Sequence, residues 1–361
     1  MDRSQALAEH IRAAAGKGKP LCIRGGGSKS FYGREPAGEP LDVCGHRGIV
    51  NYQPEELILT VRCGTPLHEV ETTLAAQNQM LPFEPPHFGP QATVGGAVAC
   101  GLSGPRRAGA GALRDYILGV RCINGRGEIL RFGGEVVKNV AGFDAARLMA
   151  GALGTLGVLL DVTFKVLPRP AAELTLAFEM DEARAIETMN RWAAQPLPLS
   201  ASSFHAGRLC VRLSGSEASL EAAHRALGGE TLAGADDYWQ ALREHRLAFF
   251  AGTHPLWRLS VPPATPPLKL GEETAGDTEW FLEWHGAQRW FRIAPEAGID
   301  AGTLRRAAAA AGGHATLFRH GDRTGEVFHP LPPALLALHK RLKAAFDPDG
   351  VLNPGRLYPA F

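Results

Sequence analysis

Residues 25–30 form the segment of this sequence best suited to bind an anion, because they read Gly-Gly-Gly-Ser-Lys-Ser and follow a short apolar run at 20–24. Successive backbone N–H groups can form a concave anion-binding nest, to which the hydroxyls add donors and the lysine adds charge. A Walker loop is excluded because Ser28 stands directly before Lys29, and Ser30 replaces the last glycine of Gly-x-Gly-x-x-Gly. These residues alone fit a phosphate cradle and a plain Gly-rich turn equally well.

A second glycine-rich stretch runs from Ala92 to Val158, and it is apolar with little net charge. A flexible linker would be polar and would lack periodic apolar residues. Glycines among Val, Leu and Ala mark backbone with positive φ or backbone that lies against a ligand. Because arginines interrupt the stretch, it suits a large, flat, partly anionic ligand.

Hydrophobic patterning predicts the elements that position these segments. We expect a helix over 2–15, strands at 20–24, 41–43, 48–52 and 57–62, and a helix through 75 with Thr65 as its N-cap. Strands at 120–123 and 128–132 form a predicted hairpin, because Asn-Gly-Arg-Gly separates them. A strand at 158–167 ends at Pro-Arg-Pro, which is the first predicted domain boundary.

The middle of the chain has a different pattern. Strands at 173–178 and 209–213 alternate with helices at 181–194 and 216–227, which suits an antiparallel sheet with helices on one face. A helix is expected at 238–250, strands at 279–284 and 288–292, and a final helix at 333–346. We interpret Trp280, Trp284 and Trp290 as core of this domain, and His205, His285 and His314 as structural histidines.

Composition limits the functional classes. The 361 residues suffice for two domains. The chain has 38 basic and 37 acidic residues, and the resulting net charge of +1 indicates no affinity for nucleic acid. Six cysteines without a C-x-x-C pair are typical of free thiols in a reducing compartment, so no metal or iron–sulfur site is predicted. The N-terminus does not read as a signal peptide and the longest apolar run is too short to span a bilayer. We expect a cytoplasmic protein that reaches a membrane, if at all, through a partner.

Five motifs occur together and in order: residues 23–28 (Ile-Arg-Gly-Gly-Gly-Ser), 92–96 (Ala-Thr-Val-Gly-Gly), 114–119 (Arg-Asp with a glycine), 139–144 (Asn-Val-Ala-Gly-Phe-Asp) and 154–158 (Gly-Thr-Leu-Gly-Val). Their combination resembles the flavoprotein family of vanillyl-alcohol oxidase and p-cresol methylhydroxylase (PCMH). The tail at 346–356 is similar to the closing signature of the branch of that family that acts on lactate and glycolate. The resemblance covers about half of the chain.

The resemblance implies an α+β fold. It implies a two-subdomain PCMH-type FAD-binding domain over residues 1–170 and a smaller α+β cap domain with an antiparallel sheet over 171–332. A C-terminal segment over 333–361 would return to the FAD domain. The flavin would lie between the two subdomains with the cap over its ring.

The resemblance also implies roles for individual residues. The first glycine loop would hold the FAD diphosphate through its backbone, the 93–96 turn would lie along the ribityl chain and phosphates, and 101–106 would line the flavin. Arg114 and Asp115 would form a structural ion pair beside the site, Gly157 and Val158 would meet the adenine, and Asn353 would return to the flavin domain. Ser28 stands where some relatives carry a flavin-linked histidine, so we expect non-covalent FAD. The full set of expected cofactor-binding residues is Gly25, Gly26, Gly27, Ser28, Lys29, Thr93, Gly95, Gly96, Gly101, Ser103, Gly104, Arg106, Arg114, Asp115, Gly157, Val158 and Asn353.

The substrate side departs from the family pattern. The 2-hydroxy-acid branch has a His-rich motif with Gly-Asp-Gly-Asn, and this chain has Gly-Asp-Arg-Thr at 321–324 with a displaced second histidine. The candidate catalytic residues are Arg319, His320, Asp322 and His329. The implied chemistry is hydride removal from C2 of a short 2-hydroxy acid, with a base for the hydroxyl proton and an arginine for the carboxylate.

The resemblance favours an FAD-binding subunit of a glycolate oxidase complex. Because the sequence shows no metal ligands, we expect an iron–sulfur partner subunit and a sister flavin subunit with the complete catalytic cap. Two alternatives stay open: a scaffold subunit that retains the fold without electron transfer, and a self-sufficient FAD-dependent 2-hydroxy-acid dehydrogenase.

Overall fold

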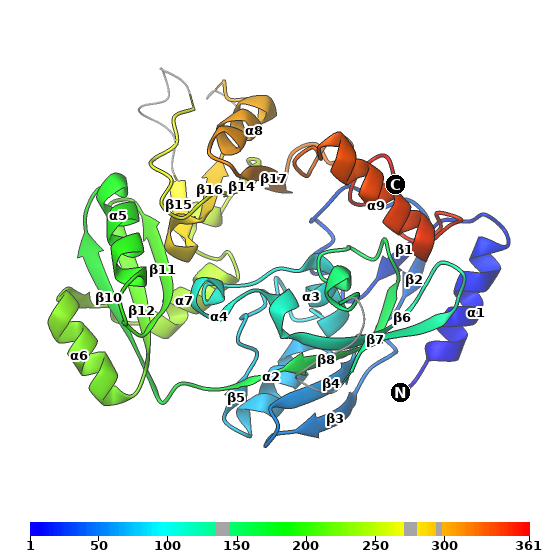
Figure 1. The fold of residues 1–361 in the computed structure, drawn as a ribbon, viewed down its shortest axis with the longest axis horizontal. Coiled ribbons are helices and arrows are strands. Elements are labelled where there is room, and N and C mark those ends of the chain that lie inside the picture. The colour runs from blue at the N-terminus through cyan, green and yellow to red at the C-terminus, as the bar shows by residue number, and fades with distance from the viewer. Residues whose placement is uncertain (135–143, 271–279, 294–297) are drawn as a thin grey trace. The chain divides into compact units, whose positions relative to one another are not determined.

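The computed structural model describes residues 1–134, 144–270, 280–293 and 298–361. The chain forms two compact units (Figure 1). Unit 1 comprises residues 1–103, 112–169 and 323–361, and unit 2 comprises residues 104–111 and 170–322. The boundaries predicted from the sequence lie at 170/171 and 332/333, and the short segment at 104–111 was not predicted to belong to unit 2.

A five-stranded antiparallel sheet forms the larger part of unit 1, with the order β3-β4-β8-β6-β7. Its strands are β3 (Ile49–Gln53), β4 (Ile58–Arg62), β6 (Ile117–Ile123), β7 (Ile129–Gly133) and β8 (Val158–Lys165). Helices α2 (Leu67–Ala75) and α3 (Val94–Cys100) share an apolar core with this sheet. The predicted hairpin is confirmed, because β6 and β7 pair across the 124–128 turn.

A second, smaller layer of unit 1 is built from the N-terminus. Helix α1 (Ser4–Ala15) packs beside the parallel pair β1 (Leu21–Arg24) and β2 (Glu39–Asp42). The last residues of the chain join this layer, since Leu352 bridges Leu21 and is fully buried with it. Unit 1 therefore has two α+β subdomains, as the family resemblance implied.

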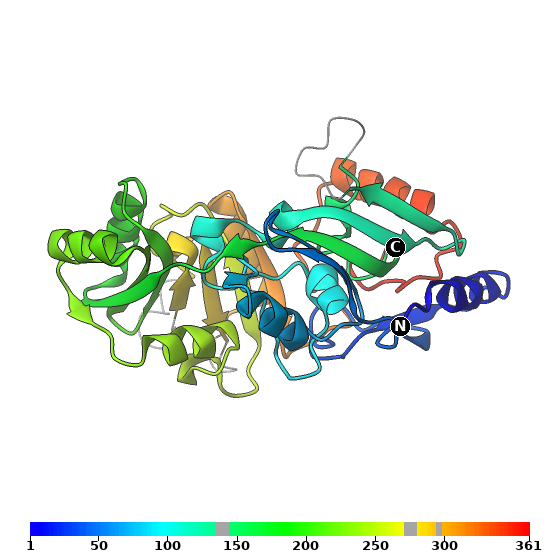
Figure 2. The same cartoon turned by 90° about the horizontal axis from the view of Figure 1, so that it is seen from below.

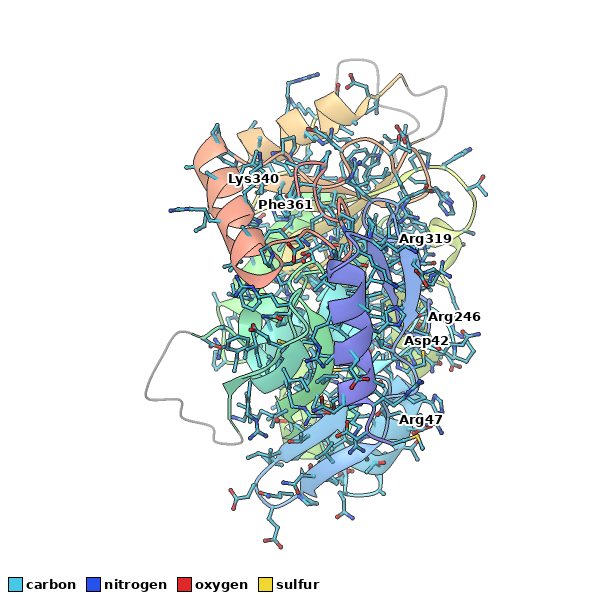
Figure 3. All side chains as sticks on the ribbon, turned by 90° about the vertical axis from the view of Figure 1, so that its right-hand side faces the viewer. Asp42, Arg47, Arg246, Arg319, Lys340 and Phe361 are labelled. Carbon is cyan, nitrogen blue, oxygen red and sulfur yellow. The ribbon has the colours of Figure 1, made fainter. Side chains whose placement is uncertain are left out.

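The C-terminal helix α9 (Pro333–Phe346) lies against the larger sheet of unit 1 (Figure 2). Phe346 contacts Phe132 of β7 with ring centroids 5.8 Å apart. The chain then turns back along its own helix, so that Phe361 lies beside His339 of α9 (Figure 3). Both bounds of this helix agree with the sequence prediction.

Unit 2 is an eight-stranded antiparallel sheet in the order β13-β10-β12-β11-β15-β16-β14-β17. Its strands are β10 (Ala172–Glu179), β11 (Leu199–His205), β12 (Arg208–Gly215), β13 (Glu230–Thr231), β14 (Leu256–Ser260), β15 (Trp280–Glu283), β16 (Gln288–Arg292) and β17 (His314–Arg319). Helices α5 (Glu182–Ala193) and α6 (Glu217–Leu227) bury their apolar sides against one face of this sheet, with α8 (Ala301–Ala310) packed on β17. The prediction of an antiparallel α+β domain is confirmed.

The remaining elements are short. Unit 1 also has the antiparallel pair β5 (Gln79–Met80) and β9 (Leu167–Pro168), and the 3₁₀ turns η1 (Leu113–Tyr116) and η2 (Arg147–Met149). Unit 2 also has α4 (Arg107–Ala110), α7 (Ala235–Arg243), η3 (Ala248–Phe250) and η4 (Trp284–Gly286).

Two element predictions need correction, and three longer strands were not predicted. Thr65 is not the N-cap of α2, because Pro66 occupies that position and the Thr65 hydroxyl accepts a hydrogen bond from Gly48 N–H at 2.8 Å. The helix predicted at 238–250 is two pieces, since His245 adopts φ +53° between α7 and η3. Strands β11, β14 and β17 were missed.

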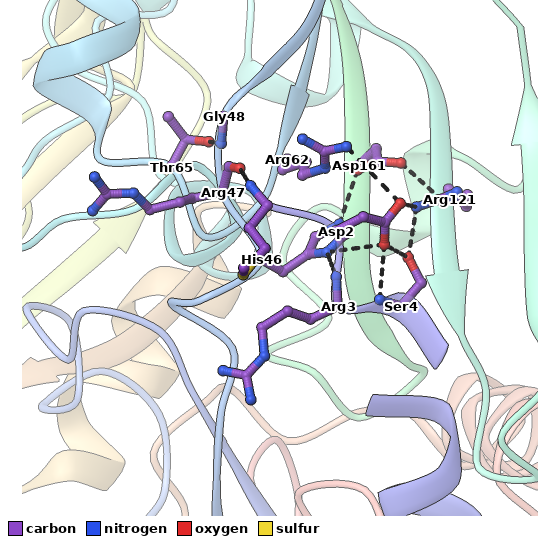
Figure 4. Close-up of polar contacts among 11 residues, drawn as sticks. Asp2, Arg3, Ser4, His46, Arg47, Gly48, Arg62, Thr65, Arg121 and Asp161 are labelled. Carbon is purple, nitrogen blue, oxygen red and sulfur yellow. Dashed lines mark hydrogen bonds and ion pairs between the residues drawn. The ribbon is translucent and has the colours of Figure 1, made fainter. Parts of the chain in front are cut away.

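A buried histidine joins the N-terminus to the larger sheet of unit 1 (Figure 4). His46 is 1% exposed, its Nδ1 accepts the Arg3 N–H at 3.0 Å, and its Nε2 lies 3.0 Å from the Asp161 carboxylate. Because Nδ1 accepts a hydrogen bond, the proton that faces Asp161 is carried by Nε2. The Arg121 guanidinium of β6 lies 2.8 Å from the other Asp161 oxygen. The carboxylate of Asp161 therefore contacts β6 through Arg121 and the N-terminal layer through His46.

All six cysteines are free thiols, as the sequence predicted. Among the described residues, no helix is both long and apolar enough to span a lipid bilayer.

Candidate functional site

The first glycine loop leaves β1 and packs directly against residues 91–93. A Cβ on Gly26 would stand 1.5 Å from the carbonyl oxygen of Gln91, and one on Gly25 would stand 2.7 Å from the Thr93 hydroxyl. Cβ atoms do not tolerate such distances, so both positions require glycine. The two glycine-rich bends at 25 and 95, far apart in the sequence, therefore lie together in unit 1.

The same loop presents unpaired backbone donors. Within the described part of the chain, the N–H groups of Gly26, Gly27 and Ser28 have no hydrogen-bond partner. Gly27 adopts φ +72° and a Cβ there would meet nothing within 4 Å. Lys29 is 6% exposed, and its Nζ lies 3.1 Å from the His87 carbonyl oxygen beside these amides. Unpaired N–H groups in a row with a positive charge beside them are the donor set that a diphosphate requires.

The second bend uses its backbone donors internally. The Gly95 N–H donates to the Cys63 carbonyl at 2.7 Å, and the Gly96 N–H donates to the Thr93 hydroxyl at 3.2 Å. Thr93 is the N-cap of α3, and Gly95 is a glycine because a Cβ would stand 2.8 Å from the Cys63 side chain. The 93–96 turn is thus held rigidly against the first glycine loop, with Gly96 partly exposed.

The residues predicted to line the flavin divide between the units. Gly101 ends α3 at φ +62° and the Ser103 hydroxyl accepts the Leu113 N–H at 3.0 Å, both in unit 1. Gly104 and Arg106 belong to unit 2. The buried Arg106 guanidinium lies 2.5 Å from the Glu173 carboxylate, so it is engaged by an ion pair inside that unit.

The expected ion pair beside the site is loose. Arg114 Nε lies 3.8 Å from Asp115 Oδ1, with the two side chains 67% and 47% exposed. The other Asp115 oxygen accepts the Ala112 N–H at 2.9 Å at the start of η1. An ion pair this exposed contributes little to the stability of the fold. The structural role of Asp115 is instead its hydrogen bond to the Ala112 N–H.

The residues expected at the adenine end lie where β8 begins. Val158 is fully buried opposite Ile123, and a Cβ on Gly157 would stand 2.9 Å from the Ile123 carbonyl oxygen. Asn353 lies close by in the same unit, since it accepts the Ile23 N–H at 2.7 Å and donates to the Leu153 carbonyl at 2.6 Å. Asn353 thus ties the C-terminal segment to β1, directly before the first glycine loop. The motif at 139–144 lies outside the described residues except for its last position.

The four candidate catalytic residues fall in both units. Arg319, His320 and Asp322 end unit 2, and His329 belongs to unit 1, where its carbonyl accepts the Tyr358 hydroxyl at 3.1 Å. Burial and the neighbouring Arg319 lower the pKa of His320, so its ring is neutral at pH 7 and can accept a proton.

His245 and Arg258 were not among the site residues predicted from the sequence. His245 stacks on Phe250 at 4.1 Å, and its pKa is held well below the usual value by burial and by the charges of Arg319 and Arg258. Arg258 comes from β14, which pairs with the strand that carries Arg319. The alternation of residues 256–260 was the available signal for this strand, and His245 therefore lies near two positive charges, those of Arg319 and Arg258.

The first glycine loop fits FAD in this structure, because it combines unpaired amides, a positive-φ glycine with open space and a buried lysine. Two family models agree with this observation. One of the FAD binding domain matches residues 2–133, and one of the C-terminal domain of FAD linked oxidases matches residues 323–357. The second match begins where unit 1 resumes after unit 2.

Over 357 residues the chain is 48% identical to the glycolate oxidase subunit GlcE of Escherichia coli, covering 99% of this chain and 98% of that protein. The chain belongs to the GlcE family of glycolate oxidase subunits. This membership and the FAD-domain match make it an FAD-dependent oxidoreductase. This GlcE-family chain is also similar to the glycolate oxidase subunit GlcD of Bacillus subtilis, with 30% identity over 42% of its length and 32% of that protein.

Solved structures support the fold of this GlcE-family chain. The structure of p-cresol methylhydroxylase with substrate bound matches with a TM-score of 0.72 at 14% identity, covering all of this chain and 88% of that one. An alkyldihydroxyacetonephosphate synthase matches with a TM-score of 0.68, also at 14% identity, over 97% and 75% of the two chains. The PCMH-type fold implied by the sequence motifs is confirmed.

Proposed function

We propose that this chain is the FAD-binding subunit of a heteromeric glycolate oxidase that converts glycolate to glyoxylate and passes the electrons to an iron–sulfur subunit. The observation that carries the proposal is the row of unpaired amides at 26–28 beside Lys29, in a chain nearly half identical to a protein named as a glycolate oxidase subunit. A catalytic flavin subunit is the second proposed partner.

The proposed reaction removes a hydride from C2 of glycolate and a proton from its hydroxyl, which leaves the aldehyde of glyoxylate. Bound FAD supplies the acceptor for the hydride. On this chain, Arg319 would hold the substrate carboxylate and neutral His320 would take the hydroxyl proton. The two electrons would pass to the iron–sulfur partner subunit.

Flavin attachment is the first test. Ser28 cannot form the histidyl link that some flavoproteins use, so we propose non-covalent FAD. Denaturation of the purified chain in acid should release all of the yellow flavin into the supernatant. Flavin that stays with the precipitated protein would overturn this part of the proposal.

The activity test compares the chain alone with the assembled complex, using glycolate and an artificial electron acceptor. We expect turnover by the complex and a loss of about 10²-fold or more in the Arg319→Gln and His320→Gln variants of this subunit. Full activity of both variants in the complex would assign the reaction to the partner flavin subunit. Turnover by the lone chain would instead support a self-sufficient dehydrogenase, and a chain that neither binds FAD nor alters turnover would be a scaffold.

A further inference from the structure

Arg323 stands where the family motif at 321–324 has its second glycine, and its side chain contacts the loop that follows the first glycine loop. Its Nε donates to the Gly33 carbonyl at 2.7 Å, and its Nη2 donates to the Ser30 carbonyl at 2.8 Å and the Arg34 carbonyl at 3.3 Å. A planar guanidinium can hold three carbonyls at fixed angles, which lysine cannot do. Arg323 thus fixes the backbone of residues 30–34 within unit 1.

Arg356 holds the same loop from a second position. It is 7% exposed, and its Nη2 donates to the carbonyls of Ser30 at 3.1 Å and Tyr32 at 2.5 Å. Its Nη1 donates to the Arg34 carbonyl. Arg323 and Arg356 therefore share the carbonyls of Ser30 and Arg34, and we call these two guanidinium groups the 323/356 clamp.

The clamp acts on the residues that present the unpaired amides. The Ser30 N–H donates to the Gly27 carbonyl at 3.0 Å, which closes a turn over residues 27–30. Both arginines hold the Ser30 carbonyl, so the turn cannot rotate without breaking charged hydrogen bonds. The direction of the Gly27 and Ser28 N–H groups is thereby fixed before any ligand arrives.

The clamp also has an electrostatic cost. Burial and the nearby charge of Arg323 lower the pKa of Arg356 to about 10, so the two like charges oppose each other. The hydrogen-bond partners of the Arg356 guanidinium are carbonyl oxygens. They accept its N–H groups but do not neutralise its positive charge. A dianionic diphosphate at the 26–28 amides would offset this repulsion.

We propose that Arg323 and Arg356 are positioning residues that hold the 25–34 loop in the conformation that binds the FAD diphosphate. This inference rests on the proposed FAD role of the loop. Arg323 directly follows Asp322, the last residue of unit 2, and is therefore the first residue of the segment that returns to unit 1.

The test titrates FAD into the full-length apo chain, with flavin fluorescence as the readout for dissociation constants. Arg323→Gln and Arg356→Gln should each weaken FAD binding by about tenfold or more, a larger loss of free energy than each causes in the stability of the apo protein. Arg323→Lys should recover part of the affinity, because it restores the charge without the planar fork. Arg246→Gln, which removes an exposed arginine of unit 2, is the matched control and should bind FAD like the parent.

Unchanged FAD affinity in Arg323→Gln would overturn this inference alone. Equal losses of affinity and apo-protein stability in both Arg323 variants would overturn it as well, because they would show a general structural role. Absence of FAD binding by the unaltered chain would instead overturn the proposed function on which the inference depends.

Discussion

Lys343 donates a 2.6 Å hydrogen bond to the carboxylate of Asp347, and both side chains are buried. The same ammonium group donates to the Thr155 carbonyl at 2.8 Å and the Leu352 carbonyl at 2.7 Å. The pair therefore joins α9 to the loop before β8 and to the C-terminal segment that bridges β1.

Replacing Lys343 by Met should destabilise unit 1 by about 3–5 kcal/mol, because it leaves a buried carboxylate without its counter-charge. Urea unfolding followed by far-UV circular dichroism measures the change, because the six tryptophans all lie in unit 2. Lys340→Met alters an exposed lysine of the same helix and should shift the unfolding free energy by less than about 0.5 kcal/mol. Equal effects of the two substitutions would contradict a structural role for the buried pair.

Gly26→Ala should abolish FAD binding, because the new Cβ would overlap the Gln91 carbonyl oxygen and force the two glycine-rich bends apart. The expected readouts are colourless protein after FAD reconstitution and a lower thermal midpoint. Gly16→Ala is the matched control, since Gly16 has φ −62° and a Cβ there would lie 3.5 Å from the nearest atom. A yellow Gly26→Ala protein with parent-like affinity would show that the close approach of these segments is not required.

The stability of the protein should fall as the pH decreases below about 6.5, with His245 as one cause. Burial, Arg319 and Arg258 lower the pKa of His245 in the folded chain, so at acidic pH the unfolded chain binds a proton that the folded chain does not. This histidine contributes a slope of about 1.4 kcal/mol per pH unit below that point. Urea unfolding from pH 7.5 to pH 5.5 measures the slope.

His245→Phe should reduce the pH slope, whereas His10→Gln, which alters an exposed histidine of α1, should leave it unchanged. The same slope in the parent and in His245→Phe would remove His245 from this explanation.

Local sequence signals predicted the elements that local chemistry determines. Helix α9 was predicted with both of its bounds, since Pro333 occupies its first position and Asp347-Pro348 follow its end. The β6–β7 hairpin was predicted because Asn124 and Gly125 favour its turn. The FAD domain was predicted from motifs whose glycines the structure places at close backbone contacts.

Other features depend on contacts between distant segments, which local patterns do not reveal. Thr65 looked like an N-cap, but its hydroxyl accepts a hydrogen bond from Gly48 N–H. Arg106 lies in a flavin-like motif, yet Glu173, 67 residues later, forms its ion pair. The clamp role of Arg323 was equally hidden, because the carbonyls it holds lie about 290 residues earlier in the sequence.

The most direct test of the central claim is an experimental structure of the full-length chain with FAD bound. We predict diphosphate oxygens about 2.9 Å from the backbone nitrogens of Gly26, Gly27 and Ser28, with Lys29 beside them. A diphosphate bound elsewhere, with these three amides still unpaired, would contradict it.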